Sequence, residues 1–279
     1  MKQATLVRNL KLFNAKERDH LMRAAYLGVS KPYEDTTKFL SDDFDTKLKL
    51  HVKELELDES QTRCVFAGMD YHLDWLFAAL WMTANHPNWD GNPDDKICLP
   101  LERHKKVDGI NNLHSDFRPL TGTQEDIDLL VVYTDGKKLA MLFIEAKGSA
   151  AFDRVQLGRK LIRLDRIIAQ ADSELHMQCR LVLVAPKKPD FRDTEGNQYT
   201  SWINFAKGLP EKRAKEFEVM KAALSEVKSK IGDEIHFIPL TEYPEKLYAV
   251  ERQRAQPKSK EGDYTHCILK SRKPKKDAT

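Results

Sequence analysis

Two apolar runs separated by a short polar turn are the clearest pattern along the chain. Residues 129–133 and 139–144 are apolar, and Thr134-Asp135-Gly136 stands between them. Glycine adopts positive φ without strain, so this arrangement favours a tight turn between two strands. The pattern therefore predicts a β-hairpin with strands over residues 127–133 and 139–147.

The flanking segments alternate between helical and strand-like periodicity. Apolar positions at helical spacing predict a helix over residues 68–84, which ends before Pro87. The other predicted helices cover residues 16–27, 151–171 and 210–230, and the other predicted strands cover 96–101, 180–185, 235–240, 246–252 and 264–269. Residues 47–57 are highly charged and ambiguous. This order predicts an α/β fold with a mixed central sheet flanked by helices.

The chain divides into three segments on this reading. We expect an N-terminal helical extension over residues 1–64, a core over 65–186, and a C-terminal α+β extension with a basic tail over 187–279. The same elements also fit one continuous domain, because 279 residues can bury one large core or two modest ones.

Charged residues stand at the ends of the predicted hairpin strands. Asp128 precedes the first apolar run, and Glu145 and Lys147 follow the second. Side chains alternate faces along a strand, so Glu145 and Lys147 point the same way. Carboxylates are the oxygen ligands that Mg²⁺ prefers, and a neighbouring lysine can stabilise charge on a phosphoryl group. The simpler interpretation is a solvated surface ion pair of little energetic weight.

With these residues in this order, the chain resembles the PD-(D/E)XK nuclease superfamily, whose fold is called restriction-endonuclease-like. The likeness covers roughly residues 65–186 and rests on Asp128, on Glu145-Ala146-Lys147 and on the order of elements. It implies an αβββαβ core, catalytic roles for Asp128, Glu145 and Lys147, and a metal ion on Asp128 and Glu145. Where the family often has a Pro before the Asp, this chain has Ile127, and Asp126 is a rival for the ligand role.

The predicted helix over residues 151–171 carries a polar stripe. Gln156, Lys160 and Arg163 recur at helical spacing, and the helix follows directly on the proposed site. We expect this stripe to contact a nucleic-acid backbone, with a solvated basic face as the alternative. The likeness to the superfamily implies the same for Gln156, since some members carry a Gln on this helix.

Two acidic residues lie one turn apart on the predicted helix over 68–84. Asp70 and Asp74 sit among apolar neighbours, where an unpaired carboxylate is costly to bury. In the family that the chain resembles, the first helix often adds an acidic ligand to the metal site, and either residue could match. Asp74 lies deeper in the apolar run and is the first choice. The alternative for Asp70 is a favourable interaction with the helix N-terminus.

Composition restricts the cellular compartment and the kinds of partner that we expect for the chain. The formal net charge is only +3, so any basic footprint has to be local. The four cysteines are far apart, with no paired spacing and no secretory pattern near Met1, which favours a reducing cytoplasm. No apolar stretch reaches the length of a membrane span, and no phosphate-binding loop motif is present.

Together these features predict a cytoplasmic nuclease that uses Mg²⁺ or Mn²⁺ to hydrolyse phosphodiester bonds, with DNA as the expected partner. The alternative is a catalytically silent module that binds nucleic acid or another partner on the same fold. The sequence does not distinguish DNA from RNA, duplex from single strand, or one oligomeric state from another.

Overall fold

The structure is a computed structural model. It describes residues 2–13, 40–92, 95–97, 99, 125–147, 152–170, 177–191, 201–202, 231–232, 234–240, 247–254 and 264–272. The helices in these ranges are α1 (Lys2–Phe13), α3 (Asp42–Lys53), α4 (Leu73–Asn85) and α5 (Arg154–Gln170). The strands are β1 (Arg63–His72), β2 (Asp126–Thr134), β3 (Leu139–Ala146), β4 (Met177–Ala185), β5 (His236–Pro239), β6 (Leu247–Arg254) and β7 (Tyr264–Arg272).

Five strands form one mixed sheet in the order β1-β2-β3-β4-β5. The β1–β2 and β2–β3 pairs are antiparallel, and β3–β4 and β4–β5 are parallel. The helix α5 makes the crossover between the parallel strands β3 and β4, since such strands cannot be joined by a tight turn. The expected α/β class with a mixed central sheet is confirmed. Strands β6 and β7 pair with each other in a separate two-stranded sheet.

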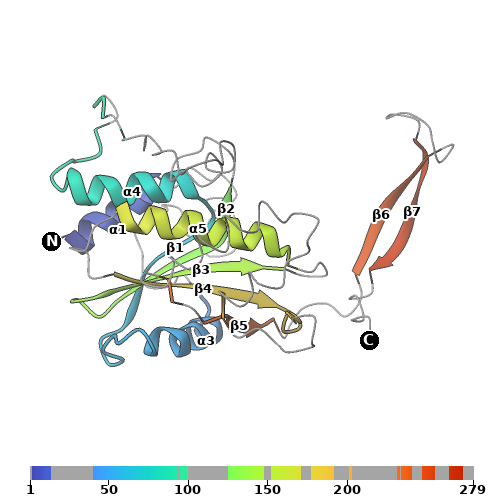
Figure 1. Cartoon of the computed structure of the whole chain (residues 1–279), viewed down its shortest axis with the longest axis horizontal. Coiled ribbons are helices and arrows are strands. Elements are labelled where there is room, and N and C mark those ends of the chain that lie inside the picture. Colours follow the sequence, from blue (N-terminus) through green and yellow to red (C-terminus); the bar gives the residue numbers. More distant parts are fainter. Residues whose placement is uncertain are drawn as a thin grey trace, which may run out of the picture.

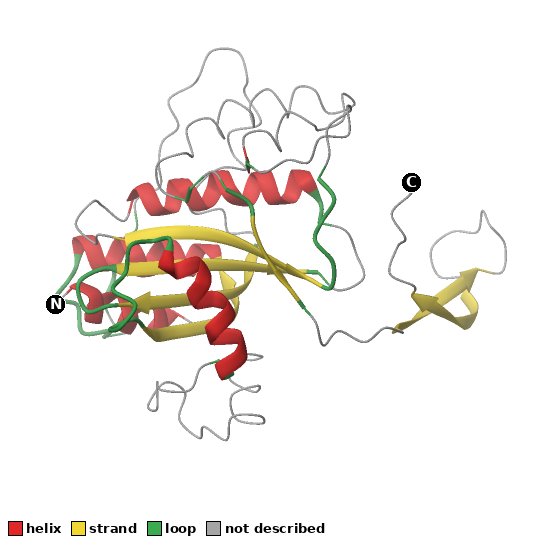
Figure 2. Ribbon diagram, turned by 90° about the horizontal axis from the view of Figure 1, so that it is seen from below, coloured by secondary structure: helices red, strands yellow, loops and turns green. Residues whose placement is uncertain are grey.

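Helices cover both faces of the sheet. Figure 1 shows α1, α4 and α5 on one face and α3 on the other, and Figure 2, seen from below, shows α3 lying across the strands. Leu10, Leu76 and Leu161 pack against the first face with Phe143 of β3. Leu48 and Val52 of α3 pack against the second face with Val131 and Leu142. Successive residues of β3 therefore point alternately towards α5 and towards α3.

The predicted helix over residues 68–84 is wrong at its start. Residues up to His72 belong to β1, which pairs along its length with β2, and α4 begins only at Leu73. The His72 side chain accepts a hydrogen bond from the Asp74 backbone N–H at 3.1 Å and caps α4. Pairing with β2 outweighs the local helical pattern, because strand formation depends on partners that sequence spacing does not reveal.

The predicted strand over residues 96–101 is also not seen where the structure describes it. Lys96, Ile97 and Leu99 are outside any strand, and the rest of that range lies outside the described residues. Three strands precede α5, namely β1, β2 and β3. The first of them, β1, comes before α4 in the sequence, whereas the expected order placed all three strands after that helix. The predicted helices over 16–27 and 210–230 lie outside the described residues, whereas α1 was not predicted and α3 falls partly in the ambiguous range 47–57.

Parts of all three predicted segments meet around this sheet. Leu6 and Leu10 of α1 belong to the same buried cluster as α4 and α5, and β5 is the fifth strand. In the part of the chain that the structure describes, no helix is both long enough and apolar enough to span a membrane.

Candidate functional site

The structure brings Asp128 and Glu145 together at the same end of β2 and β3. Leu129 pairs with Ile144, so the next step along the antiparallel strands sets Asp128 beside Glu145. The Asp128 Oδ2 atom accepts a hydrogen bond from the Ala146 backbone N–H at 2.7 Å. This bond fixes the Asp128 carboxylate at the end of β3. Both side chains belong to the face of the sheet that α5 covers.

Burial governs the chemistry of Glu145, whose exposed fraction is 2%. Burial raises the pKa of the Glu145 carboxyl, and the nearby Asp128 charge raises it further. The charges of Lys160 and Lys147 lower that pKa, in opposition to burial. Two carboxylates and two ammonium groups therefore act on one another over short distances at this point.

Lys147 follows the end of β3 and is half-buried. Its backbone N–H donates to the Val184 carbonyl at 2.9 Å, which continues the ladder between β3 and β4 by one residue. Asp128, Glu145 and Lys147 thus lie in one small region, as the spacing along β3 predicts.

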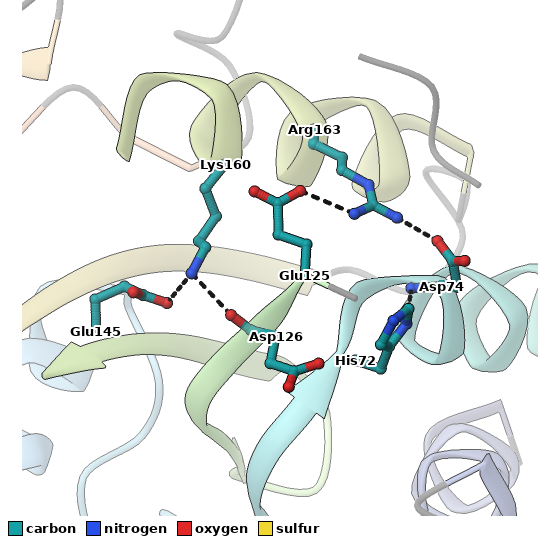
Figure 3. A network of polar contacts seen from close by, with 7 residues as sticks. All are labelled: His72, Asp74, Glu125, Asp126, Glu145, Lys160 and Arg163. Atoms are coloured by element: carbon teal, nitrogen blue, oxygen red, sulfur yellow. Dashed lines mark hydrogen bonds and ion pairs between the residues drawn. The ribbon is translucent and has the colours of Figure 1, made fainter. Parts of the chain in front are cut away.

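Lys160 of α5 reaches down onto Glu145. Its Nζ atom donates to Glu145 Oε1 at 2.5 Å and to the Asp126 backbone carbonyl at 2.7 Å. Figure 3 shows Lys160 between these two groups, with the Asp126 carboxylate directed away from Glu145. Only 2% of Lys160 is exposed, so this ammonium group has exchanged water for protein oxygens.

Arg163 makes a second bridge one turn further along α5. Its Nη1 atom donates to Glu125 Oε2 at 2.9 Å, and its Nη2 atom donates to Asp74 Oδ1 (Figure 3). The arginine is fully buried and ties α5 to the start of α4 and to the residue before β2. Asp74, the first choice for an additional metal ligand, is therefore ion-paired with Arg163.

In the predicted polar stripe, Lys160 and Arg163 are both buried and paired with carboxylates of the same chain. Gln156 is exposed at the beginning of the same helix. Leu157 and Leu161 are buried beside Lys160, and these apolar neighbours were the signal that the stripe points inward. Binding of nucleic acid by Gln156, Lys160 or Arg163 stays a prediction.

Asp70 lies across from Asp128 on the neighbouring strand. The β1–β2 pairs Met69–Leu129 and Tyr71–Ile127 bracket the two residues. Asp70 has φ 49°, a left-handed conformation that is costly for any residue with a Cβ atom. Such strain is held by the surrounding structure and clusters at functional sites. Glu125, which holds Arg163, was not singled out from the sequence.

The chemistry of the donor set fits a small divalent cation. Asp128 and Glu145 offer carboxylate oxygens, and Mg²⁺ is commonly bound by one or two carboxylates together with several waters. Among the described residues, Glu145 Oε2 and Asp128 Oδ1 make no hydrogen bond with the protein. These are the two oxygens that could coordinate such a cation.

A second group with ligand chemistry lies elsewhere on the sheet. Glu54, Glu234 and His236 each place a ligand atom within 4.8 Å of the others. The Arg180 guanidinium, however, pairs with Glu54 and lies 2.9 Å from His236 Nε2. Arg180 thus contacts two of the three ligand residues, Glu54 and His236, which makes the group the weaker metal candidate.

A cavity of about 990 Å³ opens at the other end of the hairpin. Arg8, Lys49 and Arg63 are among its lining residues, together with Thr134 and Leu139 at the turn between β2 and β3. Because Asp128 and Glu145 lie at the opposite ends of these strands, the cavity is separate from the carboxylate site.

No protein-family model matches the chain, and no curated protein or solved structure is significantly similar to it.

Proposed function

We propose that the chain is a metal-dependent phosphodiester hydrolase, a nuclease of the restriction-endonuclease-like PD-(D/E)XK kind with DNA as its first expected substrate. The observation that carries this proposal is the pairing of Asp128 with buried Glu145 beside Lys147 at the end of a β-hairpin. The strand order β1-β2-β3-β4, with α5 joining β3 to β4, supports the restriction-endonuclease-like core.

In this proposal Asp128 and Glu145 hold one divalent cation, Mg²⁺ or Mn²⁺. When bound, such an ion lowers the pKa of a bound water and neutralises charge on a phosphoryl oxygen. Lys147 supplies a compact positive charge at the same site and stabilises the negative charge that builds up on the phosphate during attack. The Ala146 N–H holds the Asp128 carboxylate in position through this step.

The direct test is cleavage of labelled duplex DNA, single-stranded DNA and RNA in the presence of Mg²⁺ or Mn²⁺. We expect Glu145→Gln to lower the rate by more than about 100-fold, because losing even a supporting partner of a metal ligand costs 10–100-fold. The matched control is Glu59→Gln, which alters an exposed carboxylate paired with Lys53. Full activity in Glu145→Gln, or equal losses in both variants, would contradict the proposal.

A catalytically silent binding module is the second candidate. The observation in its favour is that Glu145 is paired with Lys160, and Asp74 and Glu125 with Arg163, so that cations of the same chain already act on these carboxylates. Such a module would bind nucleic acid or another partner equally well with Mg²⁺ or with a chelator. A nuclease instead requires the ion for turnover.

A further inference from the structure

The position of Lys160 limits how many cations the carboxylate site can hold. Its Nζ atom lies 2.5 Å from Glu145 Oε1 and 2.7 Å from the Asp126 carbonyl, and only 2% of the residue is exposed. A cation in contact with a carboxylate oxygen and a carbonyl oxygen, and shielded from water, takes the place that a metal ion would take among the same oxygens.

The carboxylate oxygens that remain are enough for one ion. Glu145 Oε1 is used by Lys160, and Asp128 Oδ2 accepts the Ala146 N–H. Among the described residues, this leaves one oxygen of each carboxylate without a hydrogen bond to the protein. In a two-metal site the ions lie about 3.5–4 Å apart, and the Lys160 ammonium already lies against Glu145 Oε1, where a second ion would have to lie.

The charges at the site also favour one divalent ion over two. Asp128 and Glu145 carry two negative charges, and Lys147 and Lys160 carry two positive charges in the same region. One divalent ion leaves an excess of two positive charges, which a phosphodiester and an attacking hydroxide can balance. A second divalent ion would add two more positive charges where burial strengthens their mutual repulsion.

We propose that Lys160 stands in for a second metal ion, so that the Asp128–Glu145 site binds one divalent cation and not two. This inference rests on the proposed function, since it presupposes that these two carboxylates bind a metal. Lys160 acts here as a positioning residue that holds Glu145 Oε1 and excludes a second ion.

The test is the number of Mn²⁺ ions bound per chain, measured by calorimetric titration of the 279-residue chain. Glu145→Gln provides the background, because ions bound at the Glu54, Glu234 and His236 group or elsewhere remain in that variant. The number for a protein minus the number for Glu145→Gln counts the ions at this site. We expect one for the wild type, two for Lys160→Met, which removes the charge at similar volume, and one for Lys160→Arg.

Electron paramagnetic resonance gives a second readout that does not depend on the stability of the variants. With Mn²⁺ bound and the unbound ion removed, the wild type should give the signal of isolated ions, whereas two ions at one site would be magnetically coupled. A coupled signal in the wild type, or a count of two, would overturn the inference and leave the proposed function standing. One ion in both the wild type and Lys160→Met would also overturn it, with tighter binding in the variant indicating competition for one position. Equal counts in the wild type and Glu145→Gln would mean that no ion binds here, and the proposed function would fail as well.

Discussion

The left-handed conformation of Asp70 makes a prediction at the scale of one residue. At φ 49° a Cβ atom is strained, and the strain costs about 1–2 kcal/mol in a residue other than glycine. We therefore expect Asp70→Gly to be more stable than Asp70→Ala by about 1 kcal/mol in urea unfolding. Both variants lack the carboxylate, so its contacts cancel in the comparison.

The control uses a neighbouring position of the same strand. Ala67 is buried in β1 and is not among the residues with positive φ. There, glycine should be less stable than alanine, because it loses more backbone freedom on folding. The same sign at both positions would mean that the backbone of Asp70 is not held as described.

Arg163 is predicted to be a main polar contributor to stability around the site. The residue is fully buried and holds two carboxylates, so its loss leaves Asp74 and Glu125 without this partner. Breaking a buried ion pair on one side costs about 3–5 kcal/mol, and the partial exposure of both carboxylates favours the lower end. We expect Arg163→Met to lower the free energy of unfolding by about 3 kcal/mol.

Arg166, half-buried on the same helix, provides the comparison. Arg166→Met should cost less than about 1 kcal/mol, because a partly solvated charge retains much of its hydration. If Arg163→Met costs no more than Arg166→Met, Arg163 does not hold α4 and α5 together through its carboxylates.

At the scale of elements, the contact between α3, β4 and β5 predicts a dependence of stability on pH. Burial, followed by the charges of Arg180 and His51, lowers the pKa of His236 to about 4, and the charge of Glu54 opposes this shift. The unfolded chain therefore binds a proton at this histidine below about pH 6.5, whereas the folded protein does so only near pH 4. Stability is fully present above pH 6.5 and falls as the pH is lowered towards 4.

The measurement is the free energy of unfolding between pH 7.5 and 5, from urea titrations at each value. The slope from one such group approaches about 1.4 kcal/mol per pH unit. Burial also lowers the pKa of His51, which adds a slope of the same sign. We expect His236→Gln to flatten the dependence and the exposed His86→Gln to preserve it. An equal slope in His236→Gln and the wild type would assign the dependence to other groups.

The elements that the sequence predicted well are those whose patterns are local. The β2–β3 hairpin has a turn with Gly136 at φ 91°, and α5 has a regular apolar face. The strand β1 was mistaken for the first turns of α4, because Met69 and Leu73 have helical spacing and the partner strand begins more than fifty residues later. Long-range pairing of this kind leaves little trace in a short sequence window.

The candidate site followed the same rule. The proximity of Asp128, Glu145 and Lys147 is a consequence of strand alternation and hairpin register, both of which are local. The inward direction of Lys160 and Arg163 depends on how α5 packs on the sheet, and a polar stripe alone does not give that direction. Glu125 escaped notice because its role is defined by Arg163, which is far away in the sequence.

For the whole molecule, the structure changes where a nucleic-acid contact has to be sought. The formal net charge is only +3, and Lys160 and Arg163 are neutralised by carboxylates of the same chain. These two cations therefore release few counterions if they keep their present partners on binding. If the chain binds a phosphate backbone, the attraction then depends on other basic residues. Gln156 is exposed, unlike Lys160 and Arg163 of the same predicted stripe.

Stabilisation by metal is the prediction that separates a nuclease from a silent module. An ion that binds only the folded chain adds about 2.7 kcal/mol when its concentration is 100 times its Kd. For a chain of this size each kcal/mol raises Tm by about 2–4 °C, so we expect Mn²⁺ to raise Tm by roughly 5–10 °C. A silent module without a metal site should show no such rise.

The variants decide which group binds the ion. Asp128→Asn and Glu145→Gln should each abolish the rise in Tm, because they remove the charge of one of the two carboxylates at the site. Glu54→Gln should retain it, since Glu54 belongs to the separate group that Arg180 contacts. If the rise in Tm disappears only in Glu54→Gln, the metal binds at that second group. Asp128 and Glu145 would then be left as a paired feature of the hairpin without a metal to hold.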